Sequence, residues 1–191
     1  MFADEAQRLD VIEYEWLRDV HDELERRGVR MTTLLVGQPD LLNQKSAFRL
    51  SRQTHIVSRF MIDELQFHGL VTADDAATCL AGYDQTYYPE RSDWSYTRYF
   101  LPAAYSTGFR LVNQAAPLWN AFLDAHKQAR FEYALEVPMQ YFARTVEIAL
   151  IENAEHDDYG FTFSPEVWKS AVAACNFVMA QEELRMVMID D

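Results

Sequence analysis

The first forty residues place a helix pattern directly before a strand pattern. Residues 10–27 carry apolar side chains at helical spacing, and Gly28 is a typical helix stop. These side chains are Val11, Trp16, Val20 and Leu24. The apolar run at residues 31–36 ends at Gly37 and predicts a short buried strand, and residues 60–67 predict a second one. The chain therefore begins as an α/β structure that extends to about residue 70.

Helix signals dominate from residue 72 onward. Thr72 and Asp75 fit a capping box, while Ser164 and Pro165 fit the N-cap and first position of a helix. The helices that we expect lie at residues 40–55, 72–80, 94–101, 109–131 with a break at Pro117, 139–155 and 165–186. The predicted fold class is α/β followed by all-α, with domains at residues 1–71 and 72–191.

Composition excludes several classes of protein. No apolar run approaches the roughly 20 residues that cross a bilayer, and the acidic start is unlike a signal peptide, so we expect no membrane association. Cys79 and Cys175 have no CxxC spacing, which favours two free thiols in a reducing cytoplasm. The predicted location is therefore cytoplasmic.

Charge is distributed unevenly along the chain. The net charge of −13 repels phosphate backbones in general, but residues 41–62 contain four bases and no acid. These bases are Lys45, Arg49, Arg52 and Arg59. Their spacings of four, three and seven predict one helical face. That face would meet a neighbouring subunit or DNA phosphates, or would simply be solvated.

Asp4 and Glu5 form an acidic pair next to apolar residues. Such a pair suits nucleotide hydrolysis, because the first carboxylate can hold Mg²⁺ through water while the second polarises the attacking water. Gln38, at the tip of the next strand, is placed to contact the γ-phosphate or the same water. The alternative interpretations are that Asp4 and Glu5 are merely solvated residues near the terminus and that Gly37-Gln38-Pro39 is only a turn.

The order of these motifs resembles a known family. Asp4-Glu5-Ala6-Gln7, an intervening helix and the run Leu-Leu-Val-Gly-Gln-Pro-Asp-Leu-Leu at residues 34–42 resemble the Walker B and sensor 1 segments of AAA+ ATPases. The nearest branch is that of the DNA-transposition ATPases (TniB- and TnsC-like) and the related secretion ATPase ExeA. Ser58-Arg59-Phe60 looks like the arginine-finger segment, and Gly108-Phe109-Arg110 like sensor 2. The resemblance is specific over residues 3–70 and looser over residues 94–120.

This resemblance implies a partial P-loop NTPase core followed by a helical lid region. Its catalytic residues would be Asp4, Glu5, Gln38 and Arg59, with Arg110 binding nucleotide. It further implies ATP as ligand, Mg²⁺ held by Asp4 through water, and a homo-oligomer in which a neighbouring subunit supplies Arg59. A transposase or target-selection protein is an implied partner, and DNA would be contacted through Lys45, Arg49 and Arg52.

The chain departs from the family in one respect: it contains no G-x-x-x-x-G-K-[ST] motif. ATP hydrolysis is therefore expected only of an intact form that carries a P-loop, whose strand would complete the sheet. Two other readings stay open. One is a non-catalytic helical module that binds a transposase or target-selection partner, and the other is a helical domain of unrelated role.

Overall fold

The computed structural model describes residues 1–189, which form two compact units. The first comprises Met1–Gln66 and the second begins at Phe67. The described residues are mostly helical, with ten α-helices and a two-stranded parallel sheet near the N-terminus. None of the helices in this part of the chain is long and apolar enough to cross a membrane.

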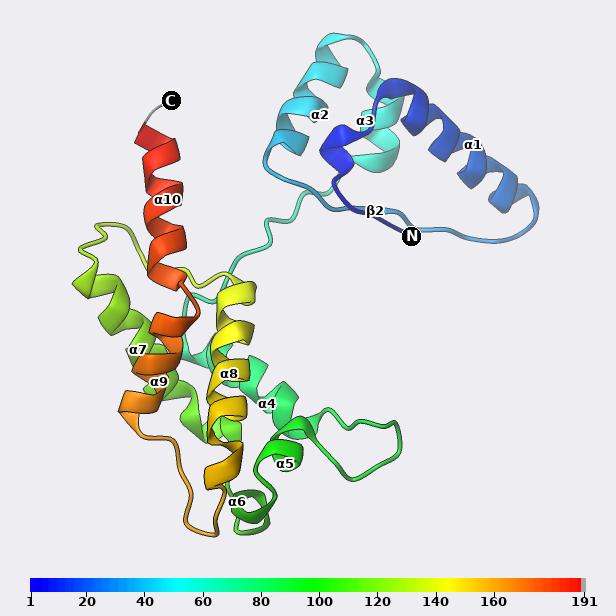
Figure 1. The fold of residues 1–191 in the computed structure, drawn as a ribbon. Coiled ribbons are helices and arrows are strands. Elements are labelled where there is room, and N and C mark those ends of the chain that lie inside the picture. Colours follow the sequence, from blue (N-terminus) through cyan, green and yellow to red (C-terminus); the bar gives the residue numbers. More distant parts are fainter. Residues whose placement is uncertain (190–191) are drawn as a thin grey trace. The chain divides into compact units, whose positions relative to one another are not determined.

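The first unit combines the small sheet with three helices (Figure 1). Its elements are β1 (Phe2–Ala3), a 3₁₀ turn (Ala6–Arg8), α1 (Val11–Arg26), β2 (Leu34–Leu35), α2 (Asp40–Leu50) and α3 (Thr54–Phe60). β1 and β2 are parallel, with Phe2 opposite Leu34 and Ala3 opposite Leu35. The strand predicted at residues 31–36 is therefore only two residues long. It is also not buried, because Leu34 is 50% exposed on a ladder with a single partner.

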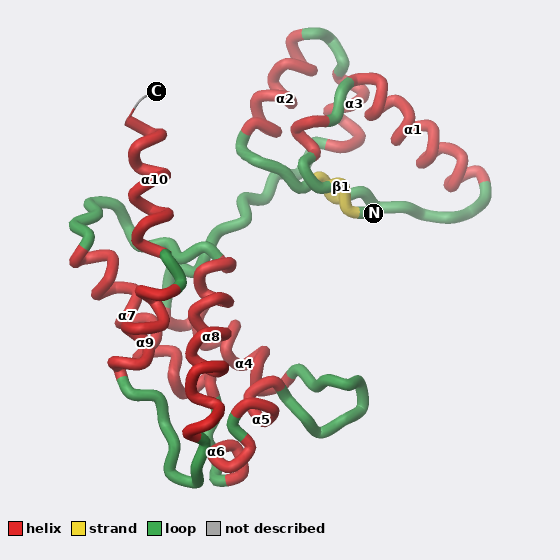
Figure 2. Tube along the Cα trace, viewed as in Figure 1, coloured by secondary structure: helices red, strands yellow, loops and turns green. Residues whose placement is uncertain are grey.

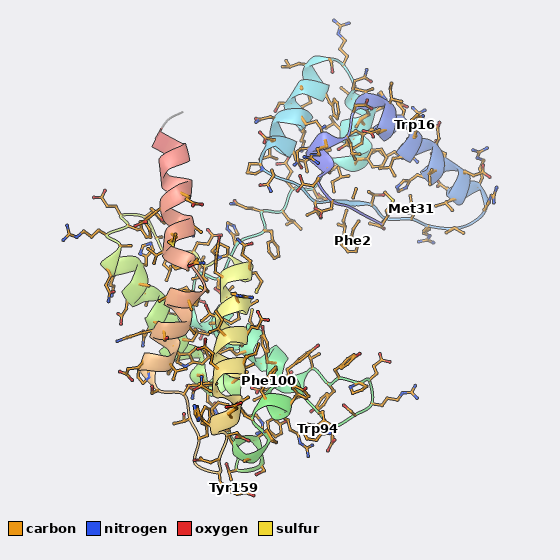
Figure 3. The ribbon with its side chains drawn as sticks, viewed as in Figure 1. Phe2, Trp16, Met31, Trp94, Phe100 and Tyr159 are labelled. Atoms are coloured by element: carbon orange, nitrogen blue, oxygen red, sulfur yellow. The ribbon has the colours of Figure 1, made fainter. Side chains whose placement is uncertain are left out.

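Helix α1 begins and ends where the sequence predicts. The Asp10 carboxylate accepts from the Glu13 N–H at 2.9 Å, Glu13 in turn accepts from the Asp10 N–H, and Gly28 has φ +75°. The apolar side chains that mark this helix in the sequence do not form its buried face, however. Tyr14 is the fully buried residue of this helix, whereas Trp16 is 64% exposed (Figure 3). The reason is that α2 and α3 cover only the Tyr14 side, through residues such as Phe48 and Ile56.

The segment after β2 differs from the prediction in two ways. The single helix expected at residues 40–55 is broken at Arg52, which has φ +63°, so α2 and α3 are separate and the four bases do not share one face. The strand expected at residues 60–67 is absent. α3 continues to Phe60, and the chain beyond it is irregular, with Leu65 95% exposed. Without a partner strand, an apolar run cannot satisfy its backbone groups as a ladder.

The second unit is a helical bundle (Figure 2). Its elements are α4 (Ala73–Gln85), α5 (Tyr96–Phe100), α6 (Pro102–Ser106), a 3₁₀ turn (Leu111–Gln114), α7 (Ala115–Gln128), α8 (Met139–Asn153), a 3₁₀ turn (Ala154–His156), α9 (Pro165–Ala174) and α10 (Phe177–Ile189). α9 packs against both α7 and α8, and α4 packs against α7. Large side chains fill the core, including Leu80, Phe122, Phe142 and Trp168.

Local signals set most helix starts in this unit. The capping box at Thr72 and Asp75 and the N-cap at Ser164 are both confirmed. The break predicted at Pro117 does not occur, because this proline lies in the first turn of α7, where its missing N–H has no intrahelical partner to lose. The helix predicted at residues 165–186 is two helices, separated at Asn176 with φ +63°. Asparagine is one of the few residues that tolerate this conformation.

Asp84 is the buried polar centre of the second unit. Its Oδ1 accepts from Thr97 Oγ1 at 2.7 Å and from the Leu111 N–H at 3.0 Å, while Oδ2 accepts from the Val112 N–H at 3.0 Å. This carboxylate therefore joins α4, α5 and the 3₁₀ turn that leads into α7.

Replacing this carboxylate by an amide tests its structural role. We expect Asp84→Asn to lower the free energy of unfolding of the second unit by about 2–3 kcal/mol, because an amide of the same shape offers one acceptor oxygen instead of two. Chemical denaturation would measure the change. Glu90→Gln, an exposed change in the loop after α4, is the matched control and should have almost no effect. Equal stability of both variants would remove Asp84 from this role.

Candidate functional site

The parallel pairing brings Asp4, Glu5 and Gln38 to one edge of the sheet. Asp4 and Glu5 follow β1, and Gln38 lies three residues beyond β2. The pairing continues past the strands, because the Ala6 N–H donates to the Val36 carbonyl at 2.9 Å. The carboxyl ends of parallel strands are where open α/β sheets bind their ligands. These three sequence-predicted residues thus occupy a position that suits a ligand site.

Gln7 links the two strand ends, and sequence reasoning gave it no role. Its Nε2 donates to Glu5 Oε2 at 2.8 Å, and its Oε1 accepts from the Gln38 N–H at 3.2 Å. Gly37 allows this approach, since a Cβ there would lie 2.4 Å from Gln7 Oε1. In the sequence, Gln7 is marked only by its place in the run Asp4-Glu5-Ala6-Gln7, beside two carboxylates.

The acidic pair could contribute one or two ligands to a magnesium site but does not form such a site by itself. Asp4 Oδ1 accepts from the Glu5 N–H at 2.9 Å, and Glu5 adopts a left-handed backbone conformation with φ +53°. No hydrogen bond to Asp4 Oδ2 occurs in the described part of the chain, so this oxygen is available to a ligand. Within residues 1–189 no group of three His, Cys, Asp or Glu side chains forms a metal site. Mg²⁺ keeps several waters and often takes one or two carboxylates plus substrate phosphates, a role that Asp4 and Glu5 fit.

A polar cluster supports this edge from the helical side. Tyr14 Oη donates to Gln44 Oε1 at 3.1 Å, and Gln44 Nε2 donates to the carbonyls of Gln7 and Leu9. Burial raises the pKa of Tyr14 to about 12, so its hydroxyl stays protonated and remains a donor at neutral pH. Helices α1 and α2 therefore hold the 3₁₀ turn that carries Gln7.

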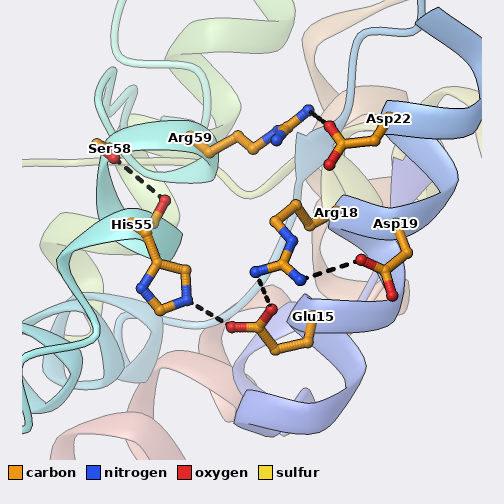
Figure 4. A network of polar contacts seen from close by, with 7 residues as sticks. All are labelled: Glu15, Arg18, Asp19, Asp22, His55, Ser58 and Arg59. Carbon is orange, nitrogen blue, oxygen red and sulfur yellow. Dashed lines mark hydrogen bonds and ion pairs between the residues drawn. The ribbon is translucent and has the colours of Figure 1, made fainter. Parts of the chain in front are cut away.

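Arg59 belongs to a different part of the first unit, the polar network between α1 and α3 (Figure 4). Its guanidinium pairs with Asp22 on α1, and nearby His55 pairs with Glu15. In the described chain it makes no contact with the acidic pair at the sheet edge. Its side chain is one-third exposed, so another molecule can reach it.

His21 lies on α1 near this network and is influenced chiefly by its burial. Burial, together with the nearby Arg59 charge, lowers the pKa of this imidazole, which is therefore neutral at neutral pH. Its Nε2 lies 2.8 Å from Thr33 Oγ1 and so connects α1 to the segment that leads into β2.

Arg110 lies in the second unit and is engaged locally. Its Nη1 donates to the carbonyls of Tyr105 and Phe109 at 2.9 and 2.6 Å, and the guanidinium carbon lies 3.5 Å from the centroid of the Tyr105 ring. Gly108, with φ +101°, makes the turn that allows this contact. These contacts give Arg110 a role in shaping the turn before α7.

The predicted basic face is replaced by a different arrangement. Lys45 is only 7% exposed and pairs with Glu64, so it does not belong to an exposed basic face. Arg49 and Arg52 are exposed, and neither forms an ion pair with a side chain that the structure describes. The break at Arg52 is the physical reason, because it turns α3 away from the helical register of α2.

Comparisons of the chain with protein-family profiles, with curated proteins and with solved structures found no match.

A methyl group at residue 37 tests the Gln7 link. We expect Gly37→Ala to displace the Gln7 side chain and to break its bond to the Gln38 N–H, at a cost of about 0.5–1.5 kcal/mol to the first unit. Amide hydrogen exchange at Gln38 should become faster. Gly82→Ala, in the last turn of α4 where a Cβ meets nothing within 4 Å, is the control and should stabilise by about 0.5–1 kcal/mol. Unchanged exchange at Gln38 would show that Gln7 does not hold it.

Proposed function

We propose that this chain is the C-terminal part of an AAA+ ATPase, a transposition helper whose intact form binds and hydrolyses ATP in a subunit assembly. The observation that carries the proposal is the parallel pairing of β1 with β2. This pairing sets Asp4 and Glu5 beside Gln38, with Gln7 bonded to both sides. In an AAA+ core, the Walker B strand and the sensor 1 strand would likewise have to be adjacent in the sheet. The first unit would be the remnant of the ATPase core, and the second unit would be the helical lid and C-terminal region.

Each polar group at this edge has a role in the proposed reaction. Glu5 would accept a hydrogen bond from the attacking water and so orient it toward the γ-phosphate. Gln7 would hold the Glu5 carboxylate in place through its 2.8 Å bond, and Gln38 would contact the same water or phosphate. Asp4 would hold Mg²⁺ through water. The bound ion would neutralise charge on the ATP phosphates, which a P-loop of the intact form would cradle.

Both arginines would have to change partners in an active assembly. Arg59, as a finger offered to a neighbouring subunit, would exchange its carboxylate partner Asp22 for a phosphoryl group. Arg110, as a nucleotide-binding residue, would give up its bonds to the Tyr105 and Phe109 carbonyls. A homo-oligomer is part of this proposal, with a transposase or target-selection protein and DNA as its further partners.

A second function is favoured by the exposed aromatic side chains in and after the loop that follows α4. They are Tyr87, Tyr88, Trp94, Tyr96 and Tyr99, all at least 42% exposed. Tyrosine and tryptophan are enriched in protein interfaces, which suits a non-catalytic helical module that binds a transposase or target-selection partner. A P-loop-bearing form that binds no nucleotide would favour this second function.

The role of Glu5 can be tested in a form of the protein that carries a P-loop. We expect Glu5→Gln to leave the ATP dissociation constant within about threefold and to lower kcat by at least about 100-fold, because the amide cannot polarise water. Steady-state ATPase assays and nucleotide titration measure the two quantities. Glu25→Gln, an exposed change on α1, is the control and should keep full turnover. Undiminished hydrolysis by Glu5→Gln would remove Glu5 from the catalytic role.

Arg59 should act across a subunit boundary in the same form. We expect Arg59→Ala and the double variant Asp4→Asn, Glu5→Gln to be inactive alone and to regain part of the activity when mixed. A mixed interface would then combine an intact acidic pair with an intact arginine. The ATPase rate across mixing ratios is the measurement, with assembly checked by light scattering. Complete absence of complementation between two variants that still assemble would argue against a finger.

A further inference from the structure

A cavity of about 350 Å³ lies in the first unit between α2 and α3. Its polar lining is Lys45 and Arg49 from α2 and Thr54 and Ser58 from α3, while Val57 and Met61 are among its apolar lining residues. Lys45 and Arg49 are one helical turn apart, and so are Thr54 and Ser58, so each helix presents one polar pair to the same space. Two cationic residues and two residues with hydroxyl groups thus line one cavity.

The two cations of this cavity differ in their surroundings. Lys45 is buried, and its ammonium is paired with Glu64. Arg49 is exposed and makes no ion pair with any side chain in the described part of the chain. Residues 41–62 supply no acid, so Glu64 comes from the irregular segment that follows α3. The described residues that line the cavity therefore include two cations and no acid.

We propose that this cavity binds a phosphate group and that Glu64 holds the place of the ligand on Lys45 when no phosphate is bound. Phosphate oxygens accept well from ammonium, guanidinium and hydroxyl donors, and Arg49 and Thr54 add such donors beside Lys45. This site needs neither the acidic pair nor nucleotide hydrolysis. It therefore does not depend on the ATPase activity proposed above.

The exchange of Glu64 for phosphate is physically reasonable because the two partners are buried to different degrees. The Lys45 side chain is 9% exposed, and a buried ammonium must keep an anionic partner. The Glu64 side chain is 50% exposed on an irregular segment, so its carboxylate can return to water at little cost. One anion thus replaces another on the lysine, while Arg49 contributes a second positive charge that Glu64 leaves unused.

The full chain can be titrated with inorganic phosphate by calorimetry. We expect saturable binding, tightened about three- to tenfold in Glu64→Gln, because the neutral amide competes less well for Lys45. Arg49→Gln should weaken binding about tenfold, which is the loss of one charge-assisted hydrogen bond. The matched control is Arg52→Gln, an exposed arginine outside the cavity lining, which should bind like the unaltered chain. Arg49 and Arg52 are both on the surface, so circular dichroism should show intact folding in both variants.

A second arm uses a short labelled DNA duplex in fluorescence anisotropy, with inorganic phosphate as competitor. Duplex binding that Arg49→Gln weakens and phosphate displaces supports the site with a nucleic-acid backbone as the source of the phosphate. Phosphate binding without duplex binding supports it with a free phosphate compound as the source. The proposal is overturned if neither the unaltered chain nor Glu64→Gln binds phosphate. It is equally overturned if Arg49→Gln and Arg52→Gln weaken binding to the same degree, since that result indicates diffuse attraction.

Discussion

The hydroxyl of Tyr14 and the amide of Gln44 hold the first unit together at the point on which its candidate site depends. Tyr14 is fully buried, packs edge-on against Phe48 and donates to Gln44. Gln44 then donates to two backbone carbonyls of the segment that carries the acidic pair and Gln7. An unpaired buried amide or hydroxyl is costly, so loss of either partner would release this segment. The position of Gln7 thus depends on a contact between two helices as well as on the pairing of the strands.

The small sheet could not serve this purpose by itself. Parallel strands are usually covered on both faces, whereas Phe2 and Leu34 are 76% and 50% exposed and the ladder is two residues long. Helix packing around Tyr14, Phe48, Ile56, Val57 and Met61 supplies the apolar core of this unit. The second unit has a much larger core, built mainly by α4, α7, α8 and α9 around side chains such as Phe122 and Trp168. The candidate functional residues of the first unit are therefore held by a smaller apolar core than those of the second unit.

The two proposals for the first unit use opposite charges. The sheet edge presents carboxylates that suit a magnesium nucleotide, whereas the cavity between α2 and α3 presents Lys45 and Arg49 to a phosphate. Each charged group already has a partner from the same unit or is open to water. Asp22 holds Arg59, and Glu64 holds Lys45. In both proposals a ligand phosphate takes the place of a carboxylate, so binding competes with a contact that exists in the free protein.

Local chemistry in the sequence determined the helix starts at Asp10, Thr72 and Ser164 and the stop at Gly28, because capping involves residues only a few positions apart. It also determined which polar residues follow the two strands, and hence Asp4, Glu5 and Gln38 as candidates. The strand predicted at residues 60–67 failed because a strand needs a partner elsewhere in the chain. The breaks at Arg52 and Asn176 escaped prediction because neither residue is the glycine that usually marks a left-handed conformation. Only the tertiary structure decided that Tyr14 is buried instead of Trp16, that Gln7 joins the strand ends and that Lys45 lies in a cavity. These outcomes depend on which helices meet across long stretches of chain, and residue spacing carries no record of that.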